Sequence, residues 1–318
     1  MKIQSTKLLI VSFLIYLVGC DSQIGIIETE QKVETIQLLK LPETILEFTS
    51  FDEYRNLVES ELEKEMFMAS RRQEVQTRPS GRINNLDITQ EIPDGFLEYL
   101  LDGNGTVIIG DYLFKVLYQD GFVYAAKKGT QAAIEIPLGK YDNKGVMKFS
   151  TEDDVLSLIE AGHTSTPGGI NAGIFCGGGC GSYDLSTPTT AFNPTGNYSY
   201  SRVRYVKAGI YFELSYHFYM HWLIPPVQFT TLNSPYSNHT AKYVKNCGST
   251  VREDSSNGLS QMMTPQNYPS DPFTPFTFNF KRNIYSSTEG LQKIFLQVSF
   301  NSIDPSIQVT SQTINCRF

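Results

Sequence analysis

The feature that most constrains the fold is the run GIYFELSYHFYMHW (209–222), in which apolar and polar side chains alternate. Residues of one parity are apolar or aromatic: Ile210, Phe212, Leu214, Tyr216, Phe218, Met220 and Trp222. Glu213, Ser215, His217 and His221 occupy the other parity. Successive side chains of a β-strand point to opposite faces, so this alternation predicts a long strand with one buried face.

This strand prediction argues against a metal site at the two histidines of the run. His217 and His221 are four residues apart, a spacing that places two zinc ligands on one face of a helix. On a strand, four residues span about 13 Å, too far for two ligands that each bind one ion at about 2 Å. Phe218 also stands where the zinc-peptidase pattern needs a Glu. A ligand from a neighbouring strand would be needed to complete a site, so we expect no metal and no cofactor.

Strand-like runs recur through the C-terminal half, separated by Pro, Asn and Ser. They are 198–206, 209–222, 241–245, 276–285, 291–300 and 307–318. Short strands at this spacing, without helical periodicity between them, are typical of an antiparallel β-sandwich or a partial barrel. We therefore expect a β-sandwich-like domain over residues 198–318.

The preceding region carries helical signals. Ser50 and Glu53 have the spacing of a capping box. Phe51, Tyr54, Val58, Leu62 and Met66 then recur every three or four residues. This pattern predicts one amphipathic helix of about five turns that packs its apolar stripe onto a domain.

Three further elements complete an expected small α+β region over residues 41–162. Phe96–Leu101 reads as a short apolar helix, and Asp120-Gly121 joins two β-rich runs as a hairpin turn. A third helix is expected from Thr151 to Ala161, with an acidic first turn and Gly162 as its stop. The fold class is therefore α+β, with N-terminal helices and a hairpin followed by a mostly antiparallel sandwich, and a Gly/Ser/Thr/Pro-rich connection over 163–197.

The first twenty residues predict an export signal. Lys2 and Lys7 precede an apolar run from Leu8 to Val18, which is the pattern of a signal peptide and is too short to span a bilayer comfortably. The next residues complete the sequence Leu17-Val18-Gly19-Cys20, which resembles the bacterial lipobox. That resemblance implies cleavage after residue 19 and acylation of Cys20 by chains such as palmitate. Several acyl chains would hold the protein on a lipid bilayer.

Export sets the organisation and the expected partners. Residues 1–19 are expected to be removed, and residues 20–40 to form a lipidated tether. Removing Lys2 and Lys7 with no acidic residue changes the net charge from −7 to −9. A negative chain without a long basic run argues against nucleic acid as a partner. We expect a protein anchored to the bacterial cell envelope, at the outer membrane or the cell surface.

Four cysteines remain after lipidation: Cys176, Cys180, Cys247 and Cys316. An even number in an oxidising compartment favours disulfides over a zinc cluster, and three pairings are possible. Cys316 shares its parity with apolar neighbours, so its sulfur is expected to point into the core, with Cys247 as its partner. Cys176 and Cys180 would then close the glycine loop GIFCGGGCGS (173–182).

No catalytic motif rises above background, so the functional expectation rests on location and on one surface. Tyr211, His217, Tyr219 and His221 lie on the polar parity of the long strand and form the candidate ligand surface, because aromatic rings bind the apolar faces of sugars. Beyond the lipobox, SFDEYRNLVESEL and DGNGTVIIGDYLFKV resemble segments of uncharacterised envelope lipoproteins of gut Gram-negative anaerobes. The resemblance implies export and no particular activity.

Two functions follow as expectations. The first is a non-enzymatic, membrane-anchored lipoprotein with a binding or structural role, whose partner is a glycan or another envelope protein. The second is an envelope hydrolase of glycan or peptidoglycan. A cleft with two carboxyl groups roughly 5–10 Å apart would favour the hydrolase.

Overall fold

The computed structural model divides the chain into two compact units, Met1–Leu41 and Pro42–Phe318. It describes residues 45–77, 95–165, 179–186, 190–191, 198–222, 236–246, 248, 250–255, 260–261, 276–301 and 310–318. All of them belong to the second unit. Within these ranges, no helix combines the length and the apolar character that a membrane crossing requires.

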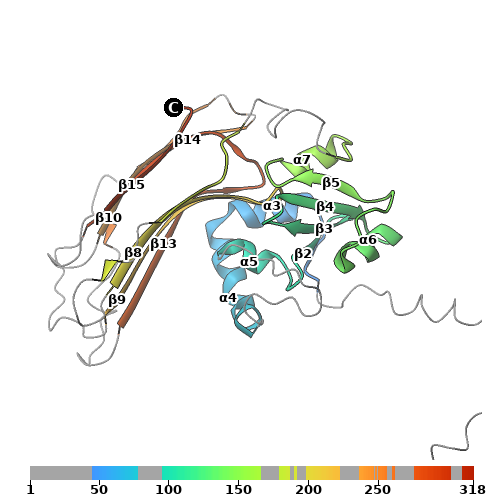
Figure 1. Cartoon of the computed structure of the whole chain (residues 1–318), viewed down its shortest axis with the longest axis horizontal. Coiled ribbons are helices and arrows are strands. Elements are labelled where there is room, and N and C mark those ends of the chain that lie inside the picture. The colour runs from blue at the N-terminus through green and yellow to red at the C-terminus, as the bar shows by residue number, and fades with distance from the viewer. Residues whose placement is uncertain are drawn as a thin grey trace, which may run out of the picture. The chain divides into compact units, whose positions relative to one another are not determined.

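The fold is α+β, as the sequence predicts: helices and a small sheet come first, and two larger antiparallel sheets follow (Figure 1). The first sheet has the order β1-β2-β3-β4-β5, in which β1 is parallel to β2 and the other pairs are antiparallel. Its strands are Glu47–Phe48, Thr106–Ile109, Tyr112–Leu117, Phe122–Lys127 and Met147–Ser150. The Asp120-Gly121 hairpin between β3 and β4 is confirmed, and a further turn at Gly110 separates β2 from β3.

The helices of this region differ in their bounds from the sequence prediction, and the helix at Gln131–Glu135 was not predicted. They are α3 (Phe51–Glu59), α4 (Glu61–Thr77), α5 (Phe96–Leu100), α6 (Gln131–Glu135) and α7 (Val155–Glu160), with the 3-10 turn η1 at Ile136–Leu138. The expected third helix starts at Val155 rather than near Thr151. The Asp153 carboxylate instead accepts a hydrogen bond from the Ser150 backbone N–H at 2.9 Å and closes a turn.

The expected five-turn helix is wrong in one respect: it breaks at Ser60. The Ser60 backbone is extended (φ −94°, ψ 114°), and its hydroxyl accepts a hydrogen bond from the Glu63 backbone N–H at 3.3 Å. Ser60 thus ends α3 and caps α4, and the break changes the phase of the second helix. Leu62 and Met66 are consequently exposed, at 67% and 65%, whereas Lys64 is buried.

The other two sheets form the sandwich. One has the order β13-β9-β8-β6 with β7 beside β8, and the other has the order β11-β10-β14-β15 with β12 beside β10. The strands are β6 (Tyr183–Ser186), β7 (Thr190–Ala191), β8 (Tyr198–Lys207), β9 (Phe212–Trp222), β10 (Tyr236–Lys245), β11 (Arg252–Ser255), β12 (Ser260–Gln261), β13 (Phe276–Ser287), β14 (Leu291–Asn301) and β15 (Thr310–Cys316).

The core of the sandwich follows the predicted alternation. Phe212, Leu214, Tyr216 and Phe218 of β9 are buried, and they belong to one cluster with the inward side chains of the facing sheet. That sheet contributes Ala241, Ile294, Leu296, Val298, Phe300 and Ile314. Alternate residues of β9 therefore face away from this core, toward the helices.

A second core joins the helices, the first sheet and the turn between β8 and β9. Ala208, Ile210 and Tyr211 of this turn are buried in the same cluster as Tyr54 of α3. The Tyr54 hydroxyl donates a hydrogen bond to the Ile210 carbonyl at 3.2 Å. Gly209 permits the turn, because its φ is +73° and a Cβ there would lie 2.6 Å from Cγ2 of Val123. The sandwich is thus anchored in the core of the preceding region.

Candidate functional site

The outward face of β8, β9 and β13 presents polar residues in rows across the strands. In the register, Arg202 of β8 and Lys281 of β13 both stand opposite His217 of β9. The next row contains Arg204, Ser215 and Asn283. Neighbouring strands are about 4.8 Å apart, so each row spans roughly 10 Å. Two rows of hydrogen-bonding side chains therefore form a compact polar surface.

This surface is one wall of a cleft of about 840 Å³. Helices α4 and α5 provide the facing wall. The residues that line the cleft are Glu61, Glu65, Met68, Arg72, Gly95, Phe96, Glu98, Tyr99, Arg202, Arg204, Ser215, His217, Phe280, Lys281, Arg282 and Asn283. The volume lies within the range of sites that bind small molecules, and it combines aromatic rings with several polar groups.

A buried carboxylate lies beneath the strand wall. Glu213 is 1% exposed and accepts hydrogen bonds from Nζ of Lys281 (2.7 Å), the Tyr211 hydroxyl (2.6 Å) and the Ser215 hydroxyl (2.7 Å). Burial alone would raise the pKa of Glu213, but the Lys281 charge and these three donors outweigh it and lower the pKa. Glu213 is therefore a fixed negative charge that holds Lys281 at the cleft.

A second strand-wall cation, Arg202, pairs with Asp184. Its guanidinium donates through Nε to Oδ1 of Asp184 at 2.7 Å and forms a second, shorter contact with Oδ2. Neither Asp184 nor Glu213 is among the residues that line the cleft. Each pair therefore has its cationic member at the cleft and its carboxylate outside the lining.

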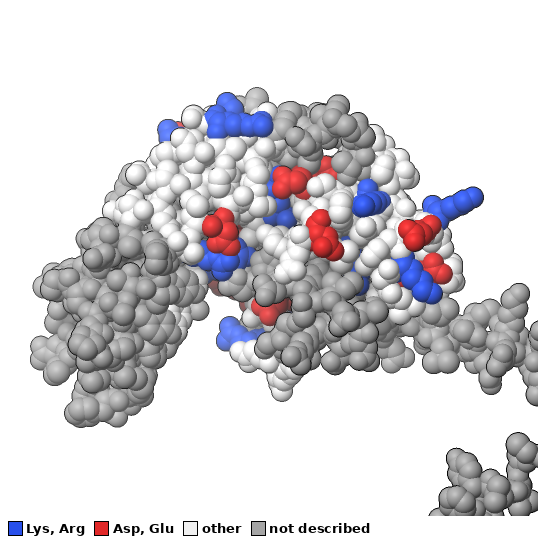
Figure 2. Space-filling view, viewed as in Figure 1, with Lys and Arg blue, Asp and Glu red and all other residues white. Residues whose placement is uncertain are grey.

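The helix wall has the opposite sign. Glu61 and Glu65 of α4 and Glu98 of α5 line the cleft together with Arg72 and Tyr99. Lys64, which is buried beside them, forms an ion pair with Glu61 and lies 6.0 Å from the ring centre of Phe96. On the face in Figure 2, acidic and basic side chains are interspersed, so the separation of sign across the cleft is a local arrangement.

The structure places only part of the expected ligand surface at this cleft. His217 lines it, and Tyr219 is half-buried two residues further along β9. Tyr211 is a correction: it is 1% exposed and belongs to the core, because β9 begins at Phe212 and the preceding turn enters the helical region. The side chain of His221 lies outside the described residues.

The disulfide pairing is also corrected. Cys180 is bonded to Cys316, with a Cα–Cα distance of 6.0 Å, so neither the Cys176–Cys180 nor the Cys247–Cys316 bridge can form. Cys316 does pack against the sandwich core, as its parity predicts. Cys20, Cys176 and Cys247 lie outside the described residues. The bond fixes the segment before β6 to the last strand.

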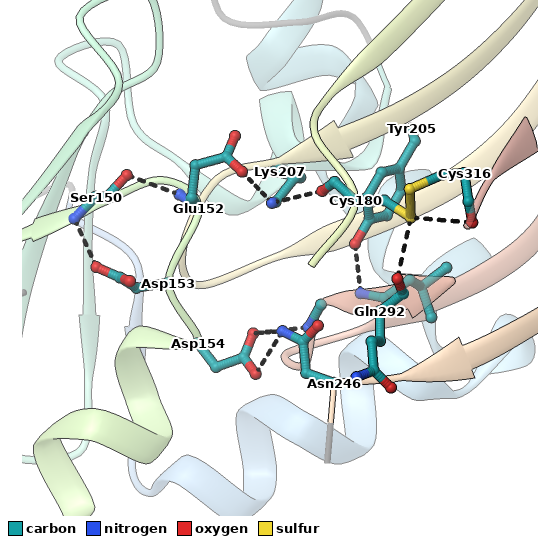
Figure 3. Close-up of polar contacts among 12 residues, drawn as sticks. Ser150, Glu152, Asp153, Asp154, Cys180, Tyr205, Lys207, Asn246, Gln292 and Cys316 are labelled. Atoms are coloured by element: carbon teal, nitrogen blue, oxygen red, sulfur yellow. Dashed lines mark hydrogen bonds and ion pairs between the residues drawn. A yellow bond between two sulfur atoms is a disulfide. The ribbon is translucent and has the colours of Figure 1, made fainter. Parts of the chain in front are cut away.

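Figure 3 shows the polar contacts around this disulfide, where the two regions meet. Lys207 donates to the Cys180 carbonyl at 2.7 Å and forms an ion pair with Glu152. Asp154 accepts hydrogen bonds from the Asn246 amide (3.1 Å) and the Gly290 N–H (2.7 Å). Two of the acidic residues expected in a helical first turn, Glu152 and Asp154, therefore bind the sandwich.

One further cluster has the residue types of a catalytic triad but not its accessibility. Ser237 and His239 both approach the Tyr216 hydroxyl at 3.3 Å, and Nε2 of His239 lies 3.4 Å from Oδ2 of Asp254. Ser237 and Tyr216 are fully buried. Burial lowers the pKa of His239, and Asp254 only partly opposes this effect. We interpret the cluster as a polar element of the sandwich interior. Among the described residues, no group of His, Cys, Asp and Glu has the arrangement of a metal site.

Sequence reasoning missed Arg202, Lys281 and Glu213 as a group, although one signal was present. Arg202 and Arg204 alternate with apolar residues in SRVRYVK (201–207), which marks them as outward residues of a strand. Tertiary packing brings these residues close to α4, and no local sequence pattern predicts that contact. Comparisons with family models and with curated proteins find no match to this chain.

Proposed function

We propose that this protein is a membrane-anchored lipoprotein of the bacterial cell envelope that binds a small saccharide in the cleft between α4–α5 and the β8-β9-β13 face. The observation that carries the proposal is the cleft itself, in which Tyr99, His217 and Lys281 converge from three elements. Aromatic rings and fixed hydrogen-bonding groups together suit a ligand with apolar ring faces and hydroxyl groups.

The non-enzymatic role is favoured over glycan hydrolysis by the state of the carboxyl groups. Glycoside hydrolysis needs one carboxylic acid with a raised pKa beside a second carboxylate. Burial raises the pKa of Asp154, but this carboxyl group accepts hydrogen bonds from Asn246 and Gly290 and does not line the cleft. Glu213 has a lowered pKa and is enclosed by its three donors.

The binding role is tested with the protein lacking residues 1–20 on a glycan array. We expect specific retention of a small set of saccharides, and loss of it in Tyr99→Ala. Tyr141→Ala is the matched control, because Tyr141 stacks on Tyr124 at 4.0 Å and does not line the cleft. Absence of binding to every glycan would refute the saccharide role, and release of shortened products would favour the hydrolase.

The anchor is tested separately in a Gram-negative host. Acylation of Cys20 would hold the full-length chain in the membrane fraction, and Cys20→Ala removes the acylated thiol. We expect the variant to be released into the soluble fraction, and Ser22→Ala, two residues away, to stay with membranes. Retention of Cys20→Ala in membranes at the wild-type level would refute the lipobox interpretation.

A further inference from the structure

The two walls of the cleft differ in the sign of their charges. The strand wall is basic, with Arg202, Arg204, Lys281 and Arg282, and the helix wall is mainly acidic, with Glu61, Glu65 and Glu98 beside one cation, Arg72. A ligand of one sign would be attracted to one wall and repelled by the other. A ligand that carries both signs can satisfy both walls at once, because opposite charges in a partly enclosed site attract more strongly than in open water.

The cations of the strand wall are held in place before any ligand arrives. Lys281 has three donor protons, and its bond to the buried Glu213 carboxylate uses one of them. The Arg202 guanidinium is held by two contacts with Asp184 and lines the cleft. Both side chains therefore suit recognition of a carboxylate without a large ordering cost.

The helix wall suits an ammonium group. Glu65 is exposed and lies one turn after Glu61 on the same face of α4. Tyr99 and Phe280 line the cleft with these acids, so a sugar ring has apolar surface available between the charged walls. The volume of about 840 Å³ fits a ligand of a few sugar or amino-acid units rather than a folded protein.

From these observations we infer that the ligand is a small saccharide that carries both an amino group and a carboxylate, as in a disaccharide with a short peptide. The inference rests on the proposed saccharide-binding function. The carboxylate would contact Arg202 and Lys281 on the strand wall, and the ammonium group would contact Glu65 on the helix wall.

The test compares four probes with the protein lacking residues 1–20 by isothermal titration calorimetry. They are N-acetylated chitotetraose (neutral), its deacetylated form (amino groups only), tetragalacturonate (carboxylates only) and a disaccharide-tetrapeptide from peptidoglycan (both). We expect the last probe to bind at least about tenfold more tightly than the other three, because it alone satisfies both walls. Its advantage should shrink as salt screens the charges.

Two variants assign the charges to their walls. Arg202→Gln should weaken binding of the disaccharide-tetrapeptide and of tetragalacturonate by about five- to tenfold, but should not affect the amino probe. Glu65→Gln should weaken the disaccharide-tetrapeptide and the amino probe by a similar factor. Arg252→Gln and Glu63→Gln are the matched controls, because both side chains are exposed and neither lines the cleft.

The outcomes separate this inference from the function on which it rests. Equal affinity for the neutral and the doubly charged probe would overturn the charge inference and leave saccharide binding intact. Equal binding of a single-sign probe would also overturn the charge inference. Equal binding of the free tetrapeptide, measured as a fifth probe, would instead show that the cleft does not recognise the sugars. No binding of any probe, together with an empty glycan array, would refute saccharide binding itself.

Discussion

At the scale of single residues, the most consequential group is the buried Glu213 carboxylate. It faces Lys281, Tyr211 and Ser215, and its pKa lies below the ordinary value of 4.5. A carboxyl group with a lowered pKa stabilises the fold above its unfolded-state pKa, and this contribution is lost as the pH falls through the folded-state pKa. Protonation of Glu213 thus contributes to the decrease in the free energy of unfolding at low pH.

Glu213→Gln should therefore lower the free energy of unfolding at pH 7 by about 2–3 kcal/mol, because Lys281 loses the carboxylate that compensates its charge. The variant and the wild type should converge as the pH falls through the lowered folded-state pKa of Glu213, since protonation removes the same charge. Urea unfolding followed by circular dichroism between pH 3 and pH 8 measures both effects. Glu63→Gln controls for loss of an exposed charge, and an unchanged decrease at low pH in Glu213→Gln would contradict the assignment.

The contribution of Asp154 to fold stability depends on pH in the opposite direction. Burial raises its pKa above 3.8, and the hydrogen bonds from Gly290 and Asn246 only partly oppose that shift. A carboxyl group with a raised folded-state pKa stabilises the fold while it is protonated, and this contribution is lost as the pH rises through the folded-state pKa. Ionised Asp154 is consequently a cost at neutral pH.

Asp154→Asn should remove that cost with little disturbance. Its Oδ1 can still accept from Gly290, and a rotated Asn246 amide can present Oδ1, which has no hydrogen-bond partner among the described residues. We expect the free energy of unfolding at pH 7 to stay within about 1 kcal/mol of wild type. Asp154→Ala should cost about 2–3 kcal/mol, because it leaves two buried donors without acceptors. Equal losses in both variants, measured by urea unfolding at pH 7, would contradict this account.

At the scale of elements, strands could be predicted from sequence more reliably than helices. The alternation in 209–222 correctly predicts which side chains of β9 enter the sandwich core, namely Phe212, Leu214, Tyr216 and Phe218. The opposite face was expected to be exposed, but Glu213 and Ser215 are also buried. The short strands β6, β7, β11 and β12 were missed, because two to four residues cannot display a period. The cleft was missed for a different reason: its walls come from residues 61–99 and 202–283, which only tertiary packing brings together.

The predicted helix failed at Ser60 because two N-terminal signals lie ten residues apart. Ser60 and Glu63 repeat the spacing of Ser50 and Glu53, and the second pair starts α4. The apolar stripe through Leu62 and Met66 continues the periodicity of α3, but the break turns those residues toward solvent. In this chain, the capping signature at Ser60 therefore determines where the helix breaks, although the apolar stripe continues past it.

Substitutions in the predicted apolar stripe should distinguish one continuous helix from two helices with a break at Ser60. Val58→Ala should destabilise the fold by roughly 2 kcal/mol, because Val58 is fully buried in the first core. Leu62→Gln should change the free energy of unfolding by less than about 0.5 kcal/mol, since its side chain is exposed. Ser60→Ala should cost about 1 kcal/mol through the lost cap of α4. Thermal unfolding measures all three, and a larger loss for Leu62→Gln than for Val58→Ala would support one continuous helix.

At the scale of the whole molecule, the two regions expected along the chain form one compact unit, a question that the sequence left open. The turn between β8 and β9 enters the helical core, and Asp154 and Lys207 bind across the boundary. Ser286 of β13 also donates to the Val58 carbonyl at 2.6 Å. The cleft forms where the two regions pack together, because each of its walls belongs to a different region.

The disulfide bonds provide a chemical test of how the chain packs. Cys180 and Cys316 are bonded across 136 residues, and the chain-entropy model assigns about 5 kcal/mol to a loop of that length. Apart from Cys20, the proposed lipidation site, the remaining cysteines are Cys176 and Cys247. A Cβ at Gly179 would lie 3.1 Å from Oδ1 of Asn246, so the chain just before Cys180 passes beside the residue that precedes Cys247.

We therefore predict a second bridge between Cys176 and Cys247. Proteolysis of the exported protein without reduction, followed by mass spectrometry, should recover Cys180 linked to Cys316 and Cys176 linked to Cys247. The double variant Cys180→Ala/Cys316→Ala should unfold at a lower temperature than Cys176→Ala/Cys247→Ala, because its bridge closes the longer loop and crosses the two sheets. A Cys176–Cys180 peptide would contradict the fold, whereas free thiols at Cys176 and Cys247 would contradict only the second bridge.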